Sequence, residues 1–440
     1  PPLRRLLGVF RARRRIGVMA DTDREYRKAF YRAVNLHQGA QMLTEEEQFE
    51  KYYVPIYEHA DGPAGPDLVK EMATAIDFTI GGSVQLLSGY RGAGKTTELL
   101  RLRRELDRGA YVPVYLDIED YLNTELPLDG GSLFIALAAG FIDSCKEADF
   151  PKQRLVARLS DFLDRLEIKG EAGVAAIDLD LKATLRDDKE FRAQVARALE
   201  SNRKVFKKEM HSFFQEIVST MPSGKMPVFI VDSIDHYRGR AATFDEVLDS
   251  VESVFSTYSS ELALPSMHVV YTVPVYAKPA GWEGQTWPVL NVKVRERDGS
   301  ECREGISLLR QVLARRAPGG DLERLLGDQV DHLICASGGQ FRELFRLVSA
   351  LLVKDGALPV GAADIDQVER HERSHAAVGI TEEQWEILRA VRQTGQLRVP
   401  RERTAEAWEL QALGYVLRYR NGTVDWYGVQ PLLNEFLDET

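Results

Sequence analysis

Short apolar runs separated by longer segments with helical periodicity form the pattern of the central part of the chain. Five runs are expected to be strands, at residues 83–88, 112–117, 228–232, 269–273 and 289–294. The run Val228-Phe229-Ile230-Val231 contains no polar position, which is typical of a parallel strand buried on both faces. Strands that alternate with helices predict an α/β fold with a parallel sheet and right-handed crossovers.

The segments around these strands are mostly helical. Helical periodicity covers residues 20–80, 131–220 and 303–375. An alternating stretch at 175–181 interrupts the second of these segments, and we expect a strand or hairpin there on the edge of the core.

The C-terminal part has a different pattern. Helices are expected at 381–394 and 404–414, and they are followed by β-rich flanks around Asn421-Gly422. An Asn-Gly pair between such flanks is a strong hairpin signal, because both residues tolerate the positive φ of a tight turn. Helices followed by a hairpin predict a small winged-helix domain.

These patterns divide the chain into five parts. They are a basic leader at 1–20 that need not belong to the native fold, an N-terminal helical region at 21–80, an α/β core at 81–300, a further helical segment at 301–376 and a winged-helix domain at 377–440.

Composition narrows the class of protein. The 440 residues are 44% hydrophobic and 28% charged, as expected for a globular protein of two or three domains. No apolar run approaches the roughly 20 residues of a membrane span, so no membrane partner is expected. Cys145, Cys302 and Cys335 are too far apart in sequence to suggest a zinc site or a disulfide framework, which favours a cytoplasmic location.

One motif identifies the chemistry. Residues 89–96 read G-x-x-x-x-G-K-T, the P-loop pattern, between an expected strand and an expected helix. Glycines let backbone N–H groups wrap a phosphate, Lys95 reaches the β- and γ-phosphates, and Thr96 holds Mg²⁺. The expected nucleotide-binding residues are Gly89, Tyr90, Arg91, Gly92, Ala93, Gly94, Lys95, Thr96 and Thr97. No N-K-x-D guanine motif follows the expected Mg²⁺ strand, so ATP and Mg²⁺ are the expected ligands.

Three further positions on the strand ends are candidates for catalysis. Asp232 ends a buried strand, where a second Mg²⁺ ligand is expected, although a helix cap is the alternative. Asp235 is the nearest carboxylate that could orient the attacking water, with a plain cap or participation of His236 left open. Thr272 ends the next strand, where it either touches the γ-phosphate or the water or is a buried structural threonine.

The segment Ser337-Gly338-Gly339-Gln340 is interpreted as a glycine turn that opens a helix. Arg342 then lies in the first turn of that helix, where its planar guanidinium could pair with phosphate oxygens from a helical lid. A surface arginine is the alternative.

Together, these residues resemble the AAA+ superclass of P-loop ATPases. The winged helix is similar to that of Orc/Cdc6-like ATPases, and Asp232-Ser233-Ile234-Asp235 is closer to STAND and KAP-type ATPases, which often serve as signalling or antiphage switches. The resemblance implies self-assembly into a homo-oligomer and a trans arginine, for which the candidates are Arg295, Arg297, Arg315 and Arg316. Ser233 stands where such ATPases carry a glutamate, which implies slow hydrolysis.

The resemblance therefore implies an ATP-binding, slowly hydrolysing switch with a protein partner or effector. A nucleic-acid loader that binds DNA through 377–440 is the first alternative, and an ATP-dependent non-catalytic scaffold is the second. The net charge of −10 argues against a general nucleic-acid coat but leaves a local basic face open. Candidate phosphate contacts in this module are Arg398, Arg401, Arg403, Arg418 and Arg420, which are interspersed with Glu402, Glu406, Glu409 and Asp425.

Overall fold

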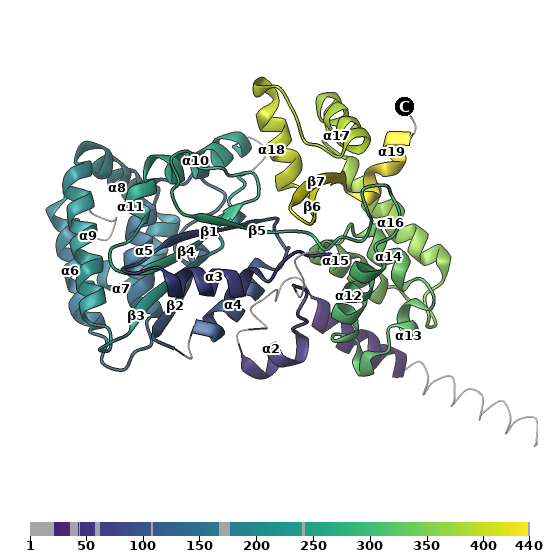
Figure 1. Ribbon diagram of the computed structural model, residues 1–440, viewed down its shortest axis with the longest axis horizontal. Helices are drawn as coiled ribbons and strands as arrows, with labels where there is room; N and C mark the ends of the chain where they lie inside the picture. The colour runs from purple at the N-terminus through teal and green to yellow at the C-terminus, as the bar shows by residue number, and fades with distance from the viewer. Residues whose placement is uncertain are drawn as a thin grey trace, which may run out of the picture. The chain divides into compact units, whose positions relative to one another are not determined.

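The computed structural model describes residues 22–35, 43, 45–57, 62–106, 109–166, 177–239 and 243–438. These residues form two compact units, of mixed α/β structure (Figure 1). One unit spans Leu68–Val289, and the other combines the described residues before Leu68 with those from Leu290 onward. The basic leader predicted at 1–20 lies outside the described residues.

The first unit is built on a five-stranded sheet in the order β2-β3-β4-β1-β5, in which every neighbouring pair is parallel. Its strands are β1 (Val84–Gly89), β2 (Tyr111–Asp117), β3 (Met226–Asp232), β4 (His268–Pro274) and β5 (Gln285–Val289). The predicted α/β class with a parallel sheet is confirmed. The central strands β3 and β4 are buried almost throughout, because helices cover both faces of a parallel sheet.

The fifth strand lies earlier in the sequence than predicted. The prediction of a strand at 289–294 is wrong, because β5 ends at Val289 and residues 290–294 are an irregular segment of the other unit. This segment satisfies its backbone outside any sheet: the Val292 N–H donates to the Gly339 carbonyl at 3.3 Å and the Lys293 N–H to the Pro63 carbonyl at 2.8 Å. Its alternating apolar residues are buried by these neighbours, and a period-two pattern does not distinguish that burial from a strand.

Helices α3 (Leu68–Phe78), α4 (Lys95–Leu106) and α5 (Gly130–Ser144) alternate with β1 and β2 along the chain, and α4 packs on β2 and β3. α5 also packs on β2 and is buried along most of its length. Gly140 of α5 allows this approach, since a Cβ there would lie 2.4 Å from the Leu116 side chain. The packing of α4 and α5 therefore stabilises the strands whose carboxyl ends carry the candidate site.

The same unit continues with α6 (Lys152–Arg165), α7 (Ile177–Asp187), α8 (Lys189–Ser201), α9 (Arg203–Ser219), α10 (Phe244–Thr257) and α11 (Ser259–Leu262). The strand or hairpin predicted at 175–181 is wrong where it can be compared, because residues 177–181 begin α7. α7 packs against α5, α6 and α8, so tertiary packing overrides the local alternation. Residues 175 and 176 lie outside the described part of the chain.

The second unit is mainly helical. It contains a helix over residues 22–34, then α2 (Glu46–Tyr52), α12 (Arg303–Ala314), α13 (Glu323–Leu326), α14 (Val330–Ala336), α15 (Phe341–Leu352) and α16 (Ala362–Ala377). Arg27 joins the first helix to the end of α15, because its guanidinium donates to the carbonyls of Leu351, Leu352 and Lys354. None of the described helices in either unit is both long and apolar enough to span a bilayer.

The C-terminal part has two helices and a hairpin, near the positions expected from the sequence. α17 (Glu382–Thr394) and α18 (Thr404–Ala412) precede β6 (Val416–Asn421) and β7 (Val424–Val429), and α19 (Asn434–Asp438) follows. β6 and β7 pair antiparallel across the Asn421-Gly422 turn. Ile387, Leu388 and Val391 of α17 form a core with residues of α18 and both strands.

The glycine turn at 338–339 fastens this hairpin to α14 and α15 within the unit. Gly338 and Gly339 have φ of 63° and 77°, which residues other than glycine rarely adopt. A Cβ at Gly339 would lie 1.7 Å from the Val292 carbonyl oxygen, and one at Gly338 would lie 2.6 Å from Leu417. The Tyr419 hydroxyl donates to the Gly338 carbonyl at 2.7 Å. The two glycines are therefore required for packing inside this unit.

The change Gly339→Ala tests this packing. Its methyl group would collide with the Val292 carbonyl, so we expect a loss of stability at least about 2 kcal/mol larger than the cost of a left-handed alanine alone. Gly319→Ala is the matched control, because Gly319 has φ of 68° but no atom within 4 Å of an added Cβ. Chemical denaturation of both variants gives the comparison, and equal losses would contradict the close approach.

Candidate functional site

The glycine loop with the P-loop pattern lies where the sequence predicts it, between the end of β1 and the start of α4. Gly92 and Gly94 have φ of 81° and 96°, so the loop depends on glycine at both positions. Gly89 pairs in register with Val289, and a Cβ on Gly89 would lie 2.9 Å from the Val289 carbonyl oxygen. The N-terminus of the 12-residue helix α4 follows directly, and the positive end of a helix dipole suits an anion.

Lys95 is buried beneath this loop, with 4% of its surface exposed. Its Nζ donates to the carbonyls of Gly89 at 3.0 Å and Tyr90 at 2.6 Å, and it lies 2.8 Å from Oδ2 of Asp235. The ammonium group is thus fully engaged by the loop and by one carboxylate.

Asp232 lies at the tip of β3 with 1% of its surface exposed. Its carboxylate accepts hydrogen bonds from the Tyr115 hydroxyl at 2.8 Å and from the Ser233 N–H at 2.7 Å. Burial and the charge of Asp235 raise the pKa of Asp232, whereas hydrogen bonds with Thr96 and Tyr115 oppose the rise. Thr96 and Asp232, both predicted Mg²⁺ ligands, are therefore brought together, and Thr97 follows in the first turn of α4.

Asp235 lies in the short 3-10 helix η4 (Ile234–His236), which begins after a tight turn. Ser233 has φ of 71°, an uncommon conformation for a residue with a side chain, and it redirects the chain at the end of β3. Thr272 of β4 is fully buried and accepts a hydrogen bond from the Ile234 N–H at 3.0 Å. Burial raises the pKa of Asp235, but Lys95 and His236 outweigh it and keep the pKa below its ordinary value.

Two acidic residues at the end of β2 were not identified from the sequence. Asp117 is in register with Asp232, and the Glu119 side chain reaches His236, with 3.1 Å between Oε1 and Nδ1. Burial raises the pKa of Glu119, but the hydrogen bond and charge of His236 and the charge of Arg91 lower it overall. The signal that could have found them is their place, at and two residues after the carboxyl end of a parallel strand.

Arg342 lies in the second unit, in the first turn of α15, as the sequence predicts. Its contact with a nucleotide stays a prediction. Among the trans-arginine candidates, the Arg316 guanidinium lies 4.7 Å from the centre of the Phe345 ring and donates to the Tyr52 carbonyl. Arg297 donates to the Thr394 carbonyl at 2.9 Å. These contacts give Arg316 and Arg297 structural tasks within their own unit.

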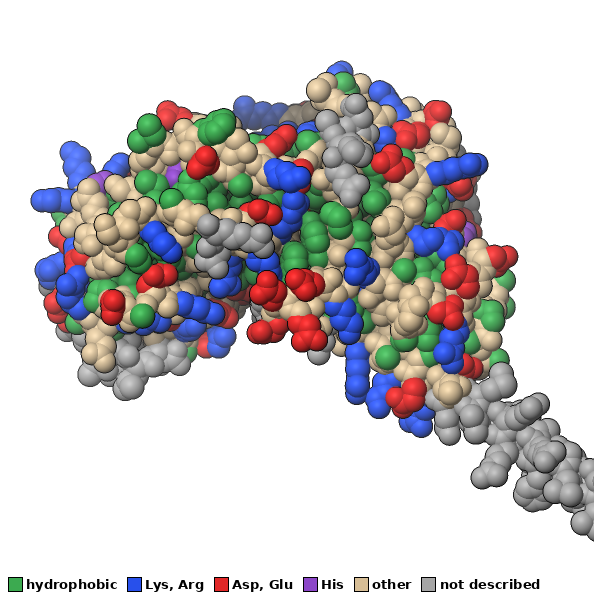
Figure 2. All heavy atoms as spheres, turned by 60° about the horizontal axis from the view of Figure 1, so that its bottom comes forward, with side chains coloured by type: hydrophobic (Ala, Val, Ile, Leu, Met, Phe, Trp, Pro, Cys, Tyr) green, Lys and Arg blue, Asp and Glu red, His purple; other side chains and the backbone are tan. Residues whose placement is uncertain are grey.

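Three of the arginines proposed for DNA contact are paired with acids. Arg418 and Arg420 both bond to Asp425, and Arg403 lies 2.9 Å from Glu386. Burial raises the pKa of Asp425, but the two arginines lower it overall. Figure 2 likewise shows Lys and Arg side chains interspersed with Asp and Glu on the face that it presents. Arg398 and Arg401 are exposed.

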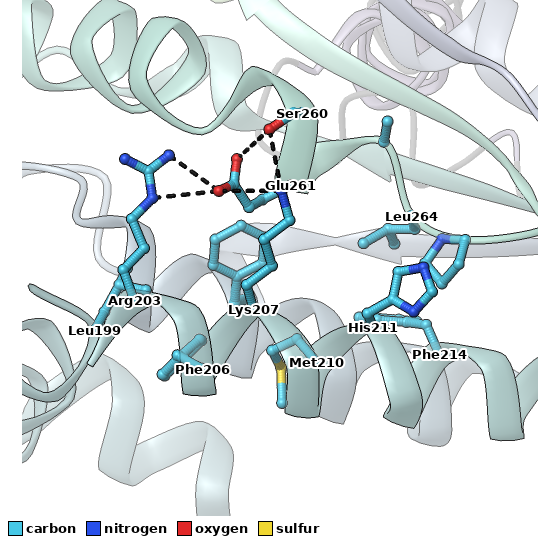
Figure 3. Close-up of a pocket in the computed structure, with 13 residues that line it drawn as sticks. Leu199, Arg203, Phe206, Lys207, Met210, His211, Phe214, Ser260, Glu261 and Leu264 are labelled. Atoms are coloured by element: carbon cyan, nitrogen blue, oxygen red, sulfur yellow. Dashed lines mark hydrogen bonds and ion pairs between the residues drawn. The ribbon is translucent and has the colours of Figure 1, made fainter.

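A separate hollow lies in the first unit, lined mainly by α9 and the segment after α11 (Figure 3). Phe206, Met210 and Phe214 form its apolar part. At its rim the Glu261 carboxylate pairs with Arg203 at 3.0 Å and lies 3.6 Å from Lys207. None of the predicted site residues lines it, and its charges are already paired.

The raised pKa of Asp117 makes the stability of the folded protein depend on pH. Burial and the charge of Asp232 raise it to about 6 from 3.8, although hydrogen bonds with Ser233 and Glu119 lower it. The folded protein therefore binds this proton more tightly than the unfolded chain, and the free energy of unfolding falls as pH rises from about 4 to about 6.

Asp117→Asn removes this effect while keeping an oxygen for the Glu119 N–H. Without nucleotide or divalent cation, we expect the variant to be more stable than wild type by about 1–3 kcal/mol at pH 7.5, with the difference vanishing below pH 4. Denaturant titrations at several pH values measure it. A difference independent of pH would contradict the raised pKa.

Comparison with known proteins gives structural neighbours alone. No protein-family model and no curated protein sequence matches the chain. A Walker-type ATPase of Pyrococcus abyssi matches with 13% identity and a TM-score of 0.39, covering 84% of this chain and 95% of its own. The Aeropyrum pernix ORC2 protein matches in its ADPNP–ADP complexes (10% identity, TM-score 0.40, 90% and 95% covered) and in its ADP form (11%, 0.40, 91% and 96%). At these TM-scores the likeness carries no functional conclusion for this chain.

Proposed function

We propose that this chain binds ATP with Mg²⁺ and hydrolyses it slowly as a molecular switch. The observation that carries the proposal is the juxtaposition of Lys95 and Thr96, at the start of α4, with Asp232 at the tip of β3. A glycine loop of the P-loop pattern holds the first two residues, and a parallel sheet holds the third. This is the arrangement that phosphoryl-transfer proteins need to hold a triphosphate and its metal.

The donors at this edge fit Mg²⁺. Thr96 offers a hydroxyl and Asp232 a buried carboxylate, and hard divalent cations prefer such oxygen ligands. When bound, Mg²⁺ would neutralise charge on the β- and γ-phosphates. The loop N–H groups would hold the phosphates, and Lys95 would turn its ammonium group toward them. For that, a triphosphate must compete with Asp235 for Lys95.

The rate of hydrolysis would depend on the side chains near the γ-phosphate. Ser233 cannot act as a strong base, so hydrolysis is expected to be slow. Thr272 holds the Ile234 N–H, so we propose that it positions the η4 segment near the γ-phosphate. Asp235 as the group that orients water stays a prediction, and it is tested below beside a second carboxylate.

The biological role is proposed from the resemblance of the motifs alone. We propose a self-assembling signalling switch, with antiphage defence as one such role, in which residues 377–440 act as a winged helix that contacts a protein partner. The DNA-loader alternative has less support, because Asp425 and Glu386 pair three of its candidate arginines. A salt-dependent DNA shift assay separates these two roles, since phosphate contacts weaken steeply with salt.

Lys95→Ala tests nucleotide binding. Deleting the ammonium group removes a charge-assisted contact to the phosphates, so we expect the Kd for Mg·ATP to rise at least about a hundredfold by calorimetry. Lys70→Ala, on α3 of the same unit, is the control for loss of a lysine. If a folded Lys95→Ala protein binds ATP as tightly as wild type, the P-loop assignment is wrong.

Asp232→Asn tests the metal site. An amide oxygen is a weaker ligand for a hard cation than a carboxylate, so we expect the Kd for ATP to rise about tenfold or more in Mg²⁺. With EDTA in place of Mg²⁺, the variant should bind ATP no worse than wild type, because a negative charge near the phosphates is gone. A loss of equal size under both conditions would instead indicate a structural defect.

A further inference from the structure

The carboxyl edge of the sheet carries two ionised carboxylates beyond Asp232, and their surroundings differ. Asp235 is enclosed: its side chain is 1% exposed, and Lys95 Nζ lies 2.8 Å from its Oδ2. Both of its carboxylate oxygens are buried. A general base must reach the water from which it takes a proton, and the buried Asp235 carboxylate beside Lys95 is poorly placed for that.

Glu119 is placed at the same edge but with access to water. The register of β2 and β3 sets Asp117 beside Asp232, and the 3-10 helix η2 (Ile118–Asp120) then brings Glu119 to η4. The Glu119 side chain is 39% exposed. Burial raises the pKa of Glu119, but the contact with His236 and the charges of His236 and Arg91 lower it overall, so Glu119 is ionised at neutral pH.

The contacts of this carboxylate leave one oxygen for a water molecule. Among the described residues, His236 Nδ1 and the Thr124 hydroxyl both contact its Oε1, at 3.1 Å and 3.3 Å. A chain of contacts then runs from Glu119 through His236 to Asp235 and Lys95, with 3.7 Å from His236 Nε2 to Asp235 Oδ2. Glu119 is therefore linked, through His236 and Asp235, to the lysine that would bind the phosphates.

We propose that Glu119 is the carboxylate that orients and deprotonates the attacking water, an assignment that rests on the proposed ATP hydrolysis. A water O–H bond breaks and its proton passes to Glu119, while the water oxygen forms a bond to the γ-phosphorus. The bond between that phosphorus and the β–γ bridging oxygen breaks, and its electron pair leaves with ADP. Glu119 then returns the proton to solvent, so that ATP and water give ADP, phosphate and a proton.

His236 has a positioning role in this proposal. Its Nδ1 faces Glu119 and its Nε2 faces Asp235, so both ring nitrogens lie next to carboxylates. Burial lowers the pKa of His236, but these two acids raise it overall. An imidazole that donates to Glu119 fixes the orientation of the carboxylate and has no need to accept the proton of water.

The test compares Glu119→Gln with Asp235→Asn in the full chain, with Glu125→Gln as the matched surface control on the same segment. We expect Glu119→Gln to bind Mg·ATP within about twofold of wild type by calorimetry. In a single turnover of pre-bound ATP, its rate should fall by about 10²–10⁴, the usual contribution of a general base. Chromatography of the extracted nucleotide should then find ATP still bound, whereas Glu125→Gln should yield ADP at the wild-type rate.

Other results would distinguish an error in the role of Glu119 from an error in the proposed ATP hydrolysis. Wild-type hydrolysis by Glu119→Gln with loss in Asp235→Asn would overturn the assignment and make Asp235 the base. A wild-type protein that binds ATP but never hydrolyses it would overturn the assignment in favour of the scaffold alternative, and one that binds no ATP would overturn the proposed function itself. If Glu119→Gln fails to fold, Glu119→Asp must bind ATP and keep partial turnover, because it retains a carboxylate; full activity would contradict the proposal.

Discussion

The ion pair between the buried ammonium group of Lys95 and the Asp235 carboxylate is the central contact at the carboxyl edge of the sheet. Asp232, Asp235, Asp117 and Glu119 all lie there, and Lys95 is the buried cation that meets Asp235 directly. The cost of burying one charge is offset by the partner charge, but two further carboxylates keep raised pKa values because burial and their neighbours disfavour ionisation. A divalent cation beside these carboxylates, such as the proposed Mg²⁺, would lower the repulsion between them.

The parts of this site that the sequence predicts are those with local rules. Gly92, Gly94 and Lys95 belong to a motif of fixed spacing, and Asp232 follows an apolar run that only a central parallel strand explains. Glu119 belongs to neither class. Its role depends on the pairing of β2 with β3, which brings residues more than a hundred positions apart into contact with each other. Sheet register is a non-local property, and no spacing along the chain encodes it.

The wrong prediction of the fifth strand has the same origin, because it too concerns contacts between residues far apart in the sequence. β5 contains Gln285, Thr286 and Pro288 and is partly exposed at the edge of the sheet, so it lacks the apolar signature of the central strands. The apolar residues of 290–294 are buried by the glycine turn and by Pro63 instead. The glycines at 338–339 were correctly interpreted as a turn before a helix, but the backbone that they admit belongs to Val292, a neighbour that only the folded chain reveals.

The attachment of the hairpin to this turn has a mechanical consequence. The chain passes from the second unit to the first at Asp67–Leu68 and returns to the second at Val289–Leu290, where β5 leads directly into residues 290–294. Those residues bond to the Gly339 carbonyl, and Gly338 bonds to Tyr419 of the hairpin. Because these contacts join residues 290–294, the glycine turn and the hairpin within the second unit, a shift of any one of these three segments would change the hydrogen bonding of the other two.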